Sequence, residues 1–174
     1  GFITTLSDKM ERKCVAQLVE DVRTRVYPVG RLDRDSEGLL LLTDDGEFAN
    51  AMTHPAKHVP KTYRDTVRPS ITEDQITALT TGVEIDGRMT LPSEVRVISK
   101  QEGRVVLEII IYEGRNRQIR KMCETLGLEV ARLKRTQIGS VKLGMLKQGD
   151  WRNLTEEEVH KLMVAATVDR KAQK

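Results

Sequence analysis

Residues 30–43 read GRLDRDSEGLLLLT, a charged loop that runs directly into a short apolar segment. Four leucines and a threonine are typical of a short strand, and we expect this strand to be buried on both faces. The nine residues before it carry five charged side chains between two glycines. Charged groups at the border of a low-dielectric core are solvated, paired or reactive. The charge pattern alone therefore leaves both a solvated turn and a reactive site open.

The rest of the chain reads as an alternation of short helices and strands. Apolar spacing predicts helices at about 12–24, around 48–52, from 72 to 82, from 116 to 126, and from 155 onward. Apolar or alternating runs predict strands at 59–68, 83–85, 88–91, 95–99, 104–112, 130–138 and 141–146. Because hairpin signals dominate, we expect an α+β fold with a mixed, mainly antiparallel sheet flanked by helices.

Several local signals set the predicted boundaries of these elements. Thr72 and Gln75 form a capping-box pattern, and Gly82 is placed to end the helix that they begin. An Asp-Gly pair at 86–87 is typical of a two-residue hairpin turn. In the last helix we expect the buried side to include Val159, and with it Leu162, Met163 and Ala166.

Composition is that of a soluble chain that builds its own core. The 174 residues carry a net charge of +3, and no apolar run approaches membrane-spanning length. Residues 112–135 hold seven Lys/Arg against three Glu, a local net charge of +4. Such a basic cluster is typical of a phosphate-binding surface, although a solvated helix face looks similar. Two cysteines without zinc or redox spacing indicate reduced thiols and a cytoplasmic protein.

Three segments, in this order, resemble the bacterial ribosomal-RNA pseudouridine synthases of the RsuA/RluB type. They are GRLDRDSEGLLLLTDDG at 30–46, KTY at 61–63 and EGRNRQIRKM at 113–122. The resemblance extends from about residue 1 to about residue 159. It implies the pseudouridine synthase fold, with a central cleft between two sub-lobes whose boundary we expect near 66–70. The catalytic domain would then span 1–168, followed by a flexible tail at 169–174.

The resemblance also implies which residues have which catalytic roles. From the residues alone, Asp33, Asp35 and Glu37 are all candidate carboxylates, acting as nucleophile or as base and electrostatic stabiliser. The resemblance selects Asp33, with Arg120 as the cation that keeps it ionised and Tyr63 as a ring that stacks on uracil and relays its C5 proton. From the basic cluster and the charge near the motifs we expect RNA contacts by Arg31, Lys61, Arg115, Arg117, Lys121, Arg132, Lys134 and Arg135, and we expect active-site packing by Leu32 and Ile119.

The expected function is isomerisation of a uridine in ribosomal RNA to pseudouridine, without cofactor or metal. Residues 144–154 resemble the branch that acts on large-subunit rRNA more than the small-subunit branch. His54 and His58 stand four apart, but a proline between them breaks helical spacing and no third ligand is evident. We expect a monomer that contacts rRNA and no membrane, and the resemblance implies an S4-type RNA-binding module upstream that this sequence lacks.

Two other function classes remain open at this point. A non-catalytic RNA-binding or ribosome-assembly factor on the same fold would not need Asp33, Tyr63 and Arg120 together. A carboxylate-dependent glycosidase would need a second carboxylate facing Asp33. The chain also departs from the family pattern at Ser36, where threonine is favoured, and at Asp65, where an aliphatic strand residue is usual. The second departure calls the packing near Tyr63 into question.

Overall fold

The structure, a computed structural model, describes residues 25–54 and 59–167, which form two compact units. The first combines the chain up to Val59 with the chain from Gln137, and the second is Pro60–Thr136. We expected the boundary near 66–70, but residues 61–68 form one uninterrupted strand and the division falls before it. The predicted helix at 12–24 and the tail from 169 lie outside the described residues. Within those ranges no helix has the length and apolarity to cross a membrane.

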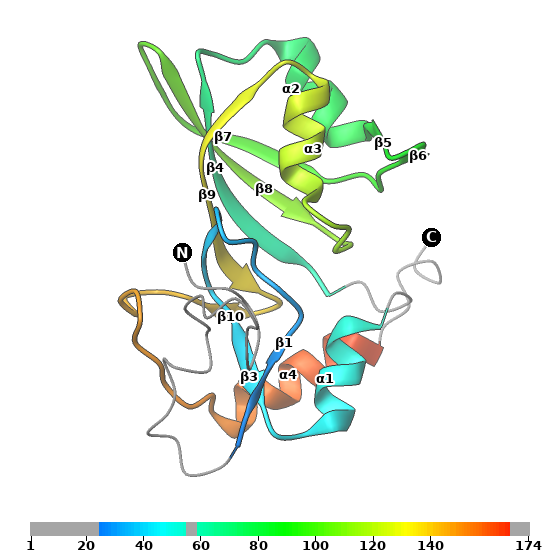
Figure 1. Cartoon of the computed structure of the whole chain (residues 1–174), viewed down its shortest axis with the longest axis vertical. Coiled ribbons are helices and arrows are strands. Elements are labelled where there is room, and N and C mark those ends of the chain that lie inside the picture. Colours follow the sequence, from blue (N-terminus) through cyan, green and yellow to red (C-terminus); the bar gives the residue numbers. More distant parts are fainter. Residues whose placement is uncertain (1–24, 55–58, 168–174) are drawn as a thin grey trace, which may run out of the picture. The chain divides into compact units, whose positions relative to one another are not determined.

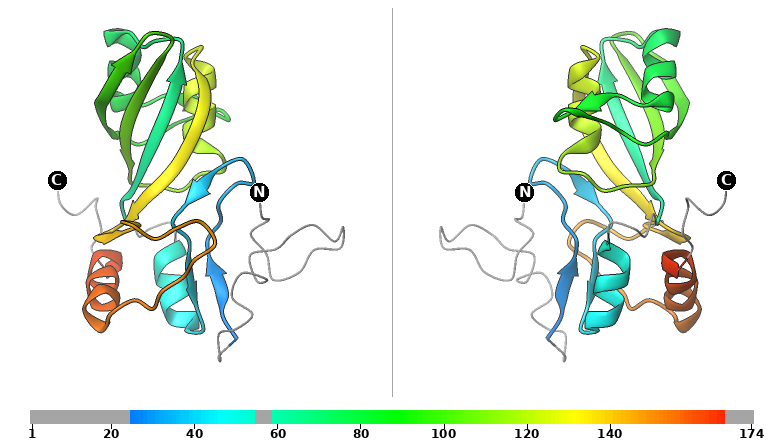
Figure 2. Two further views of the ribbon diagram at one scale, coloured as in Figure 1. Left: turned by 90° about the vertical axis from the view of Figure 1, so that its left-hand side faces the viewer. Right: turned by 90° about the vertical axis from the view of Figure 1, so that its right-hand side faces the viewer.

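The second unit is a sheet covered on one face by two helices, as Figures 1 and 2 show. Its strand order is β9 (Glu129–Ile138), β4 (Lys61–Arg68), β8 (Arg104–Ile111) and β7 (Glu94–Gln101). Strands β4 and β7 each pair antiparallel with β8, so the most apolar strand lies inside the sheet. Helices α2 (Glu73–Thr81) and α3 (Gln118–Thr125) bury Leu79 and Met122 in one core with Leu107 and Ile109 of β8. The predicted mainly antiparallel α+β fold is confirmed for this unit.

Local capping signals fix the ends of α2 and of the hairpin that follows it. The Thr72 hydroxyl accepts a hydrogen bond from the Gln75 backbone N–H, and the Gln75 side chain accepts one from Thr72 N–H, which completes the capping box. The helix ends at Gly82 as predicted. The Asp-Gly pair then joins β5 (Glu84–Ile85) to β6 (Arg88–Met89) in an antiparallel hairpin.

Helix α3 begins two residues later than its sequence indicates. Arg117 has a left-handed φ of 49°, which places it before the helix rather than inside it. From Gln118 onward the helix buries Ile119, Met122 and Cys123 against the sheet. The apolar stripe that predicted the helix is therefore the stripe that anchors it.

The first unit packs two helices against a small hairpin. Strand β1 (Tyr27–Val29) pairs antiparallel with β3 (Leu41–Thr43), and helix α1 (Gly46–Thr53) packs on both of them and on α4 (Glu156–Thr167). The last residues of β9 pair with β10 (Val141–Lys142). A single core unites these elements, with Val29, Leu41, Phe48, Met52, Val141, Leu162 and Ala166 among its buried members.

Three expectations for the first unit differ from the structure. Leu39 and Leu41 are buried but Leu40 and Leu42 are only half-buried, so the leucine strand is fully buried on one face rather than two. The prediction that Val159 is buried is wrong, because α4 directs it to a side where it is 37% exposed. The expected strand at 141–146 is limited to β10.

Strand β7 stands at the end of the strand order in its sheet. Its pairing with β8 shifts register between Val97 and Ser99, which marks a bulge around Ile98. The bulged Ile98 is 39% exposed, and charged residues such as Arg96 and Lys100 flank it on the same strand. The outer strand is therefore locally irregular and polar along much of its length.

A close backbone approach at Gly82 generates a stability prediction. Gly82 has φ 133° and ψ 149°, a conformation nearly restricted to glycine, and an added Cβ would lie 2.7 Å from the Thr90 carbonyl oxygen. We expect Gly82→Ala to lower the free energy of unfolding by about 2–4 kcal/mol through strain and overlap combined. Gly103 is a matched control because its φ is also positive, 81°, with nothing within 4 Å of an added Cβ. Gly103→Ala should lower that free energy by about 1 kcal/mol, from strain alone. Equal losses in urea unfolding would contradict a role for the overlap.

Candidate functional site

The charged loop at 30–38 belongs to the first unit and folds as a tight turn. Ser36 N–H donates a hydrogen bond to the Asp33 carbonyl at 3.0 Å, and the chain then enters β2 (Glu37–Gly38). Asp33 is half-buried, whereas Asp35 at the tip of the same turn is exposed. Leu32 is half-buried and Arg31 exposed on the approach to the turn. Burial therefore separates Asp33 from Asp35 but not from Glu37, which is also half-buried.

In the second unit, one face of β4 carries a graded series of side chains. Residues alternate between faces along a strand, so Lys61, Tyr63, Asp65 and Val67 share one face. Val67 is a core residue, and Tyr63 is half-buried and packs against the same core. The face thus changes from apolar at its Val67 end to polar at its Lys61 end.

Lys61 is held in an environment that disfavours its charge. Burial, reinforced by the positive charge of Arg135 on β9, lowers the pKa of Lys61 to about 8. An added Cβ at Gly114 would lie 3.1 Å from Lys61 Nζ, so the amine lies close to the backbone at that glycine. The loop before α3 therefore lies over the Lys61 end of β4.

Helix α3 lies over the next part of the same face. Cys123 donates a hydrogen bond from its thiol to Asp65 Oδ2 at 3.2 Å. Arg120 precedes Cys123 by one helical turn and is half-buried, on the border of the buried stripe as predicted. The adjacent Ile119 is 3% exposed and belongs to the core. Because residues 114–123 run along residues 61–65 of β4, Arg120 is placed over the stretch that includes Tyr63.

The sequence did not predict that Asp65, which lies next to Tyr63 on the same face of β4, is completely buried. It is 0% exposed, and burial raises its pKa to about 6 against the opposing effects of the Cys123 hydrogen bond and the Arg120 charge. Burial and the nearby Asp65 charge also raise the pKa of the Cys123 thiol, which stays protonated. The one signal in the sequence was an acid at a strand position where an aliphatic residue is usual.

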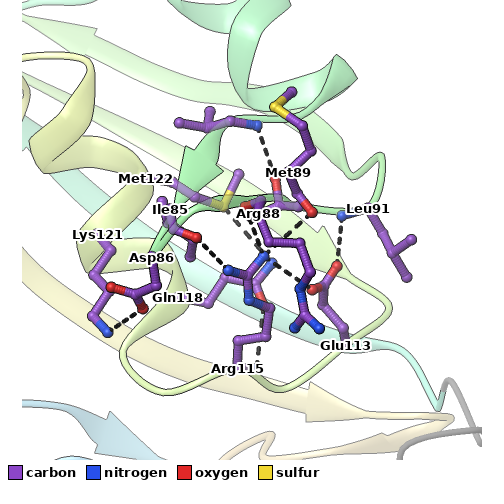
Figure 3. A network of polar contacts seen from close by, with 12 residues as sticks. Ile85, Asp86, Arg88, Met89, Leu91, Glu113, Arg115, Gln118, Lys121 and Met122 are labelled. Atoms are coloured by element: carbon purple, nitrogen blue, oxygen red, sulfur yellow. Dashed lines mark hydrogen bonds and ion pairs between the residues drawn. The ribbon is translucent and has the colours of Figure 1, made fainter.

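Arg115 lies in a network that ties the α3 loop to the β5–β6 hairpin (Figure 3). Its guanidinium donates to the carbonyls of Arg88 at 3.2 Å and Met89 at 3.3 Å, and to that of Ile85. Glu113 accepts a hydrogen bond from Leu91 N–H at 2.6 Å in the same network. The expected RNA contact by Arg115 stays a prediction, but these bonds give its side chain a structural role that the sequence did not indicate.

The other basic residues expected to contact RNA differ in how accessible they are. Arg117 and Arg132 are exposed and Lys134 is half-buried. Lys121 forms an ion pair with Asp86 at 2.7 Å, and Arg135 is only 4% exposed. The exposed members are therefore better placed for phosphate contact than Arg135. Across 25–54 and 59–167, no group of three or more His, Cys, Asp and Glu side chains is arranged to hold a metal ion.

The buried carboxylate of Asp65 generates a prediction about stability and pH. Burial raises its folded pKa to about 6 from the ordinary value of 3.8, so between these pH values the folded chain binds a proton that the unfolded chain has lost. This group's contribution to stability is complete below about pH 4 and is lost as pH rises through about 6, a loss of about 3 kcal/mol. Urea unfolding between pH 4 and 7 should show this decline in the wild type and not in Asp65→Asn, which is neutral throughout. Parallel profiles for the two proteins would contradict the assignment.

Comparison with known proteins places these features in a family. A family model described as RNA pseudouridylate synthase matches residues 1–125. The ribosomal large subunit pseudouridine synthase B of Bacillus subtilis is 39% identical over 168 residues, covering 95% of this chain and 69% of that protein. The dual-specificity RNA pseudouridine synthase RluF of Escherichia coli is 40% identical over 159 residues, covering 91% of this chain and 53% of that protein.

Solved structures agree with the sequence comparison. A crystal structure of a pseudouridylate synthase superimposes with a TM-score of 0.82 at 31% identity, covering 92% of this chain and 70% of that one. An archaeal Nop10–Cbf5 complex aligns with a TM-score of 0.52 at 20% identity over 72% of this chain, a likeness of fold alone. The chain spans 62% of an uncharacterised RNA pseudouridine synthase of Aquifex aeolicus, which is 38% identical over 154 residues. On this evidence the chain belongs to the RNA pseudouridylate synthase family.

Proposed function

We propose that this chain isomerises a uridine of large-subunit ribosomal RNA to pseudouridine, with Asp33, Tyr63 and Arg120 as its catalytic residues. The observation that carries the proposal is the half-buried Asp33 in its turn, within the motif that defines the family resemblance. Support for the substrate comes from the 39% identity to the large-subunit enzyme of B. subtilis. The RNA contacts, the large-subunit target and the catalytic roles all belong to this proposal.

The reaction needs groups of the kind that these residues supply. The C1′–N1 bond of uridine breaks, uracil turns, and a C1′–C5 bond forms, after which C5 loses its proton and N1, released from C1′, takes one up. No atom or electron is gained or lost, so no co-reactant is required. A carboxylate beside C1′ acts as nucleophile or stabilises an oxocarbenium-like carbon, as carboxylates do in glycoside chemistry. Asp33 fills this role in either route.

Tyr63 and Arg120 contribute from the second unit. The half-buried Tyr63 ring, toward the polar end of the β4 face, offers a stacking surface for a uracil that has left its RNA stack. The Arg120 guanidinium has five donors in a planar fork, which suits it to hold a carboxylate. Exposed Arg31, Arg117 and Arg132 are proposed to hold the phosphates that flank the target.

Replacing Asp33 tests the centre of the proposal. We expect Asp33→Asn to abolish pseudouridine formation on ribosomal RNA, because the amide has neither the charge nor the nucleophilicity of the carboxylate. Asp35→Asn, a change at the exposed tip of the same turn, is the matched control and should retain activity. Full activity in Asp33→Asn together with loss in Asp35→Asn would move the role to Asp35. If the wild-type protein binds the RNA but forms no pseudouridine, it is an RNA-binding factor rather than an enzyme.

Two changes at Tyr63 separate its ring from its hydroxyl. Tyr63→Phe should keep stacking and lose only proton relay, whereas Tyr63→Ala should lose both and reduce kcat by about a further five- to hundredfold, the range that corresponds to about 1–3 kcal/mol for one base–aromatic stack. Single-turnover rates at saturating RNA give the comparison directly. Small and equal effects of the two changes would make Tyr63 a purely structural residue.

A further inference from the structure

Helix α3 begins without the side-chain cap that usually fixes where a helix starts. Arg117 occupies the N-cap position with φ 49°, and its side chain makes no capping hydrogen bond. Two hydrogen bonds between Arg115 and Gln118 fix the start instead. The Arg115 N–H donates to Gln118 Oε1 at 3.3 Å, and the Gln118 N–H donates to the Arg115 carbonyl at 3.2 Å. Because Gln118 is buried, this part of the loop is held inside the fold.

The side chain of Arg115 joins the same loop to the β5–β6 hairpin (Figure 3). Its guanidinium donates to the carbonyl of Ile85 on β5. It also donates to the carbonyls of Arg88 and Met89 on β6, at 3.2 and 3.3 Å. One guanidinium therefore holds both strands of the hairpin. The Arg115 side chain is only 13% exposed, so these donors serve main-chain oxygens of the chain itself.

The hairpin has a fixed base against which Arg115 can hold the loop. Ile85 is buried and belongs to the core of the second unit. Just after the hairpin, the Leu91 N–H donates to Glu113 Oε2 at 2.6 Å. Glu113 precedes Arg115 by two residues, so this bond ties the same loop to the chain that leaves the hairpin. The loop is thus bonded to the hairpin and to its exit.

Arg120 lies in the first turn of α3, two residues after Gln118. A helix is regular over one turn, so a contact that fixes Gln118 also fixes the backbone of Arg120. A further link between α3 and the hairpin is the 2.7 Å ion pair of Lys121 with Asp86. Asp86 is exposed, and surface ion pairs of this kind contribute little. Arg115 is therefore the stronger polar link between the hairpin and the start of α3.

We propose that Arg115 is a positioning residue, which fixes the start of α3 against the β5–β6 hairpin and thereby the place of Arg120, and that it does not contact RNA. This inference rests on the proposed function, in which Arg120 is catalytic. It revises the expectation, drawn from the basic cluster, that Arg115 contacts phosphate. A guanidinium suits the task because its planar fork has five donors, enough for acceptors on two strands at once. A lysine ammonium has one nitrogen and cannot span both strands in this way.

Two substitutions at Arg115 separate positioning from phosphate contact. Arg115→Met removes every side-chain donor, whereas Arg115→Lys keeps the positive charge. In both we expect the single-turnover rate at saturating RNA to fall about ten- to a hundredfold, the order expected when a reacting group is misplaced by about 1 Å. The RNA concentration that gives half-saturation should stay that of the wild type. Lysine also binds phosphate, so a wild-type rate in Arg115→Lys would overturn the inference.

The salt dependence of RNA binding gives a readout in which catalysis plays no part. Removing a phosphate contact lowers the slope of log K against log salt by about 1. We expect this decrease in Arg132→Met, whose exposed arginine is proposed to hold a phosphate, and no decrease in Arg115→Met. The matched control is Arg96→Met, which removes a 71% exposed arginine 3.2 Å from Glu108 and should leave both rate and slope unchanged. A slope lowered by about 1 in Arg115→Met would overturn the inference, whatever its rate.

Hydrogen exchange tests the link in the absence of RNA and keeps this inference distinct from the proposed function. In Arg115→Met the Gln118 N–H should exchange about tenfold faster, the order expected from loss of one charge-assisted hydrogen bond, while the Leu107 N–H in the core strand β8 and both amides in Arg96→Met should not. Such a result in a protein whose wild type forms no pseudouridine would overturn the proposed function and leave the link standing. Unchanged exchange at Gln118 would overturn the inference even in an active enzyme. Equal acceleration at Gln118 and Leu107 would report a general loss of stability and would overturn it too.

Discussion

One face of β4 has to seal a core and present polar groups within a span of seven residues, and the second unit is arranged around that constraint. Val67 lies in the core at one end, and Lys61 lies at the other with its pKa lowered to about 8. Because side chains alternate, the change from apolar to polar must take place at Asp65 and Tyr63. Helix α3 covers this transition, and its buried stripe fixes where Arg120 stands. A shift of α3 by one turn would remove both the core contact and the site together.

Signals that act over a few residues were predicted well from the sequence. The capping box at Thr72, the hairpin turn at Asp86 and the end of α2 at Gly82 are all confirmed, because each depends on backbone groups three or four residues away. The family followed from three motifs in order, and the α+β fold class followed from the hairpin signals. The exact ends of helices were less predictable. Helix α3 starts after Arg117 because that residue adopts a left-handed conformation that no local pattern indicated.

Contacts between parts of the chain that are distant in sequence could not be predicted from the sequence. Charge density at 112–135 predicted a phosphate-binding surface, yet Arg115 bonds to carbonyls 26–30 residues away and Arg135 is buried. The thiol of Cys123 reaches a carboxylate 58 residues earlier. A count of basic residues records charge but not the partner that each charge will meet. Similarly, the leucine run gave the strand but not its burial, since which leucines face solvent depends on where α1 and α4 pack.

The irregular outer strand β7 affects the tendency of the protein to aggregate. A straight, apolar edge strand offers unpaired backbone groups to any other sheet edge, and this is a common route to aggregation. In β7 the bulge between Val97 and Ser99 interrupts the regular spacing of those backbone groups. A second chain that paired with β7 would also have to accommodate the charged side chains of Arg96 and Lys100. The same strand that leaves Ile98 partly exposed thus resists edge-to-edge association. Straightening it, by deletion of the bulged residue, would make the domain prone to form intermolecular sheets.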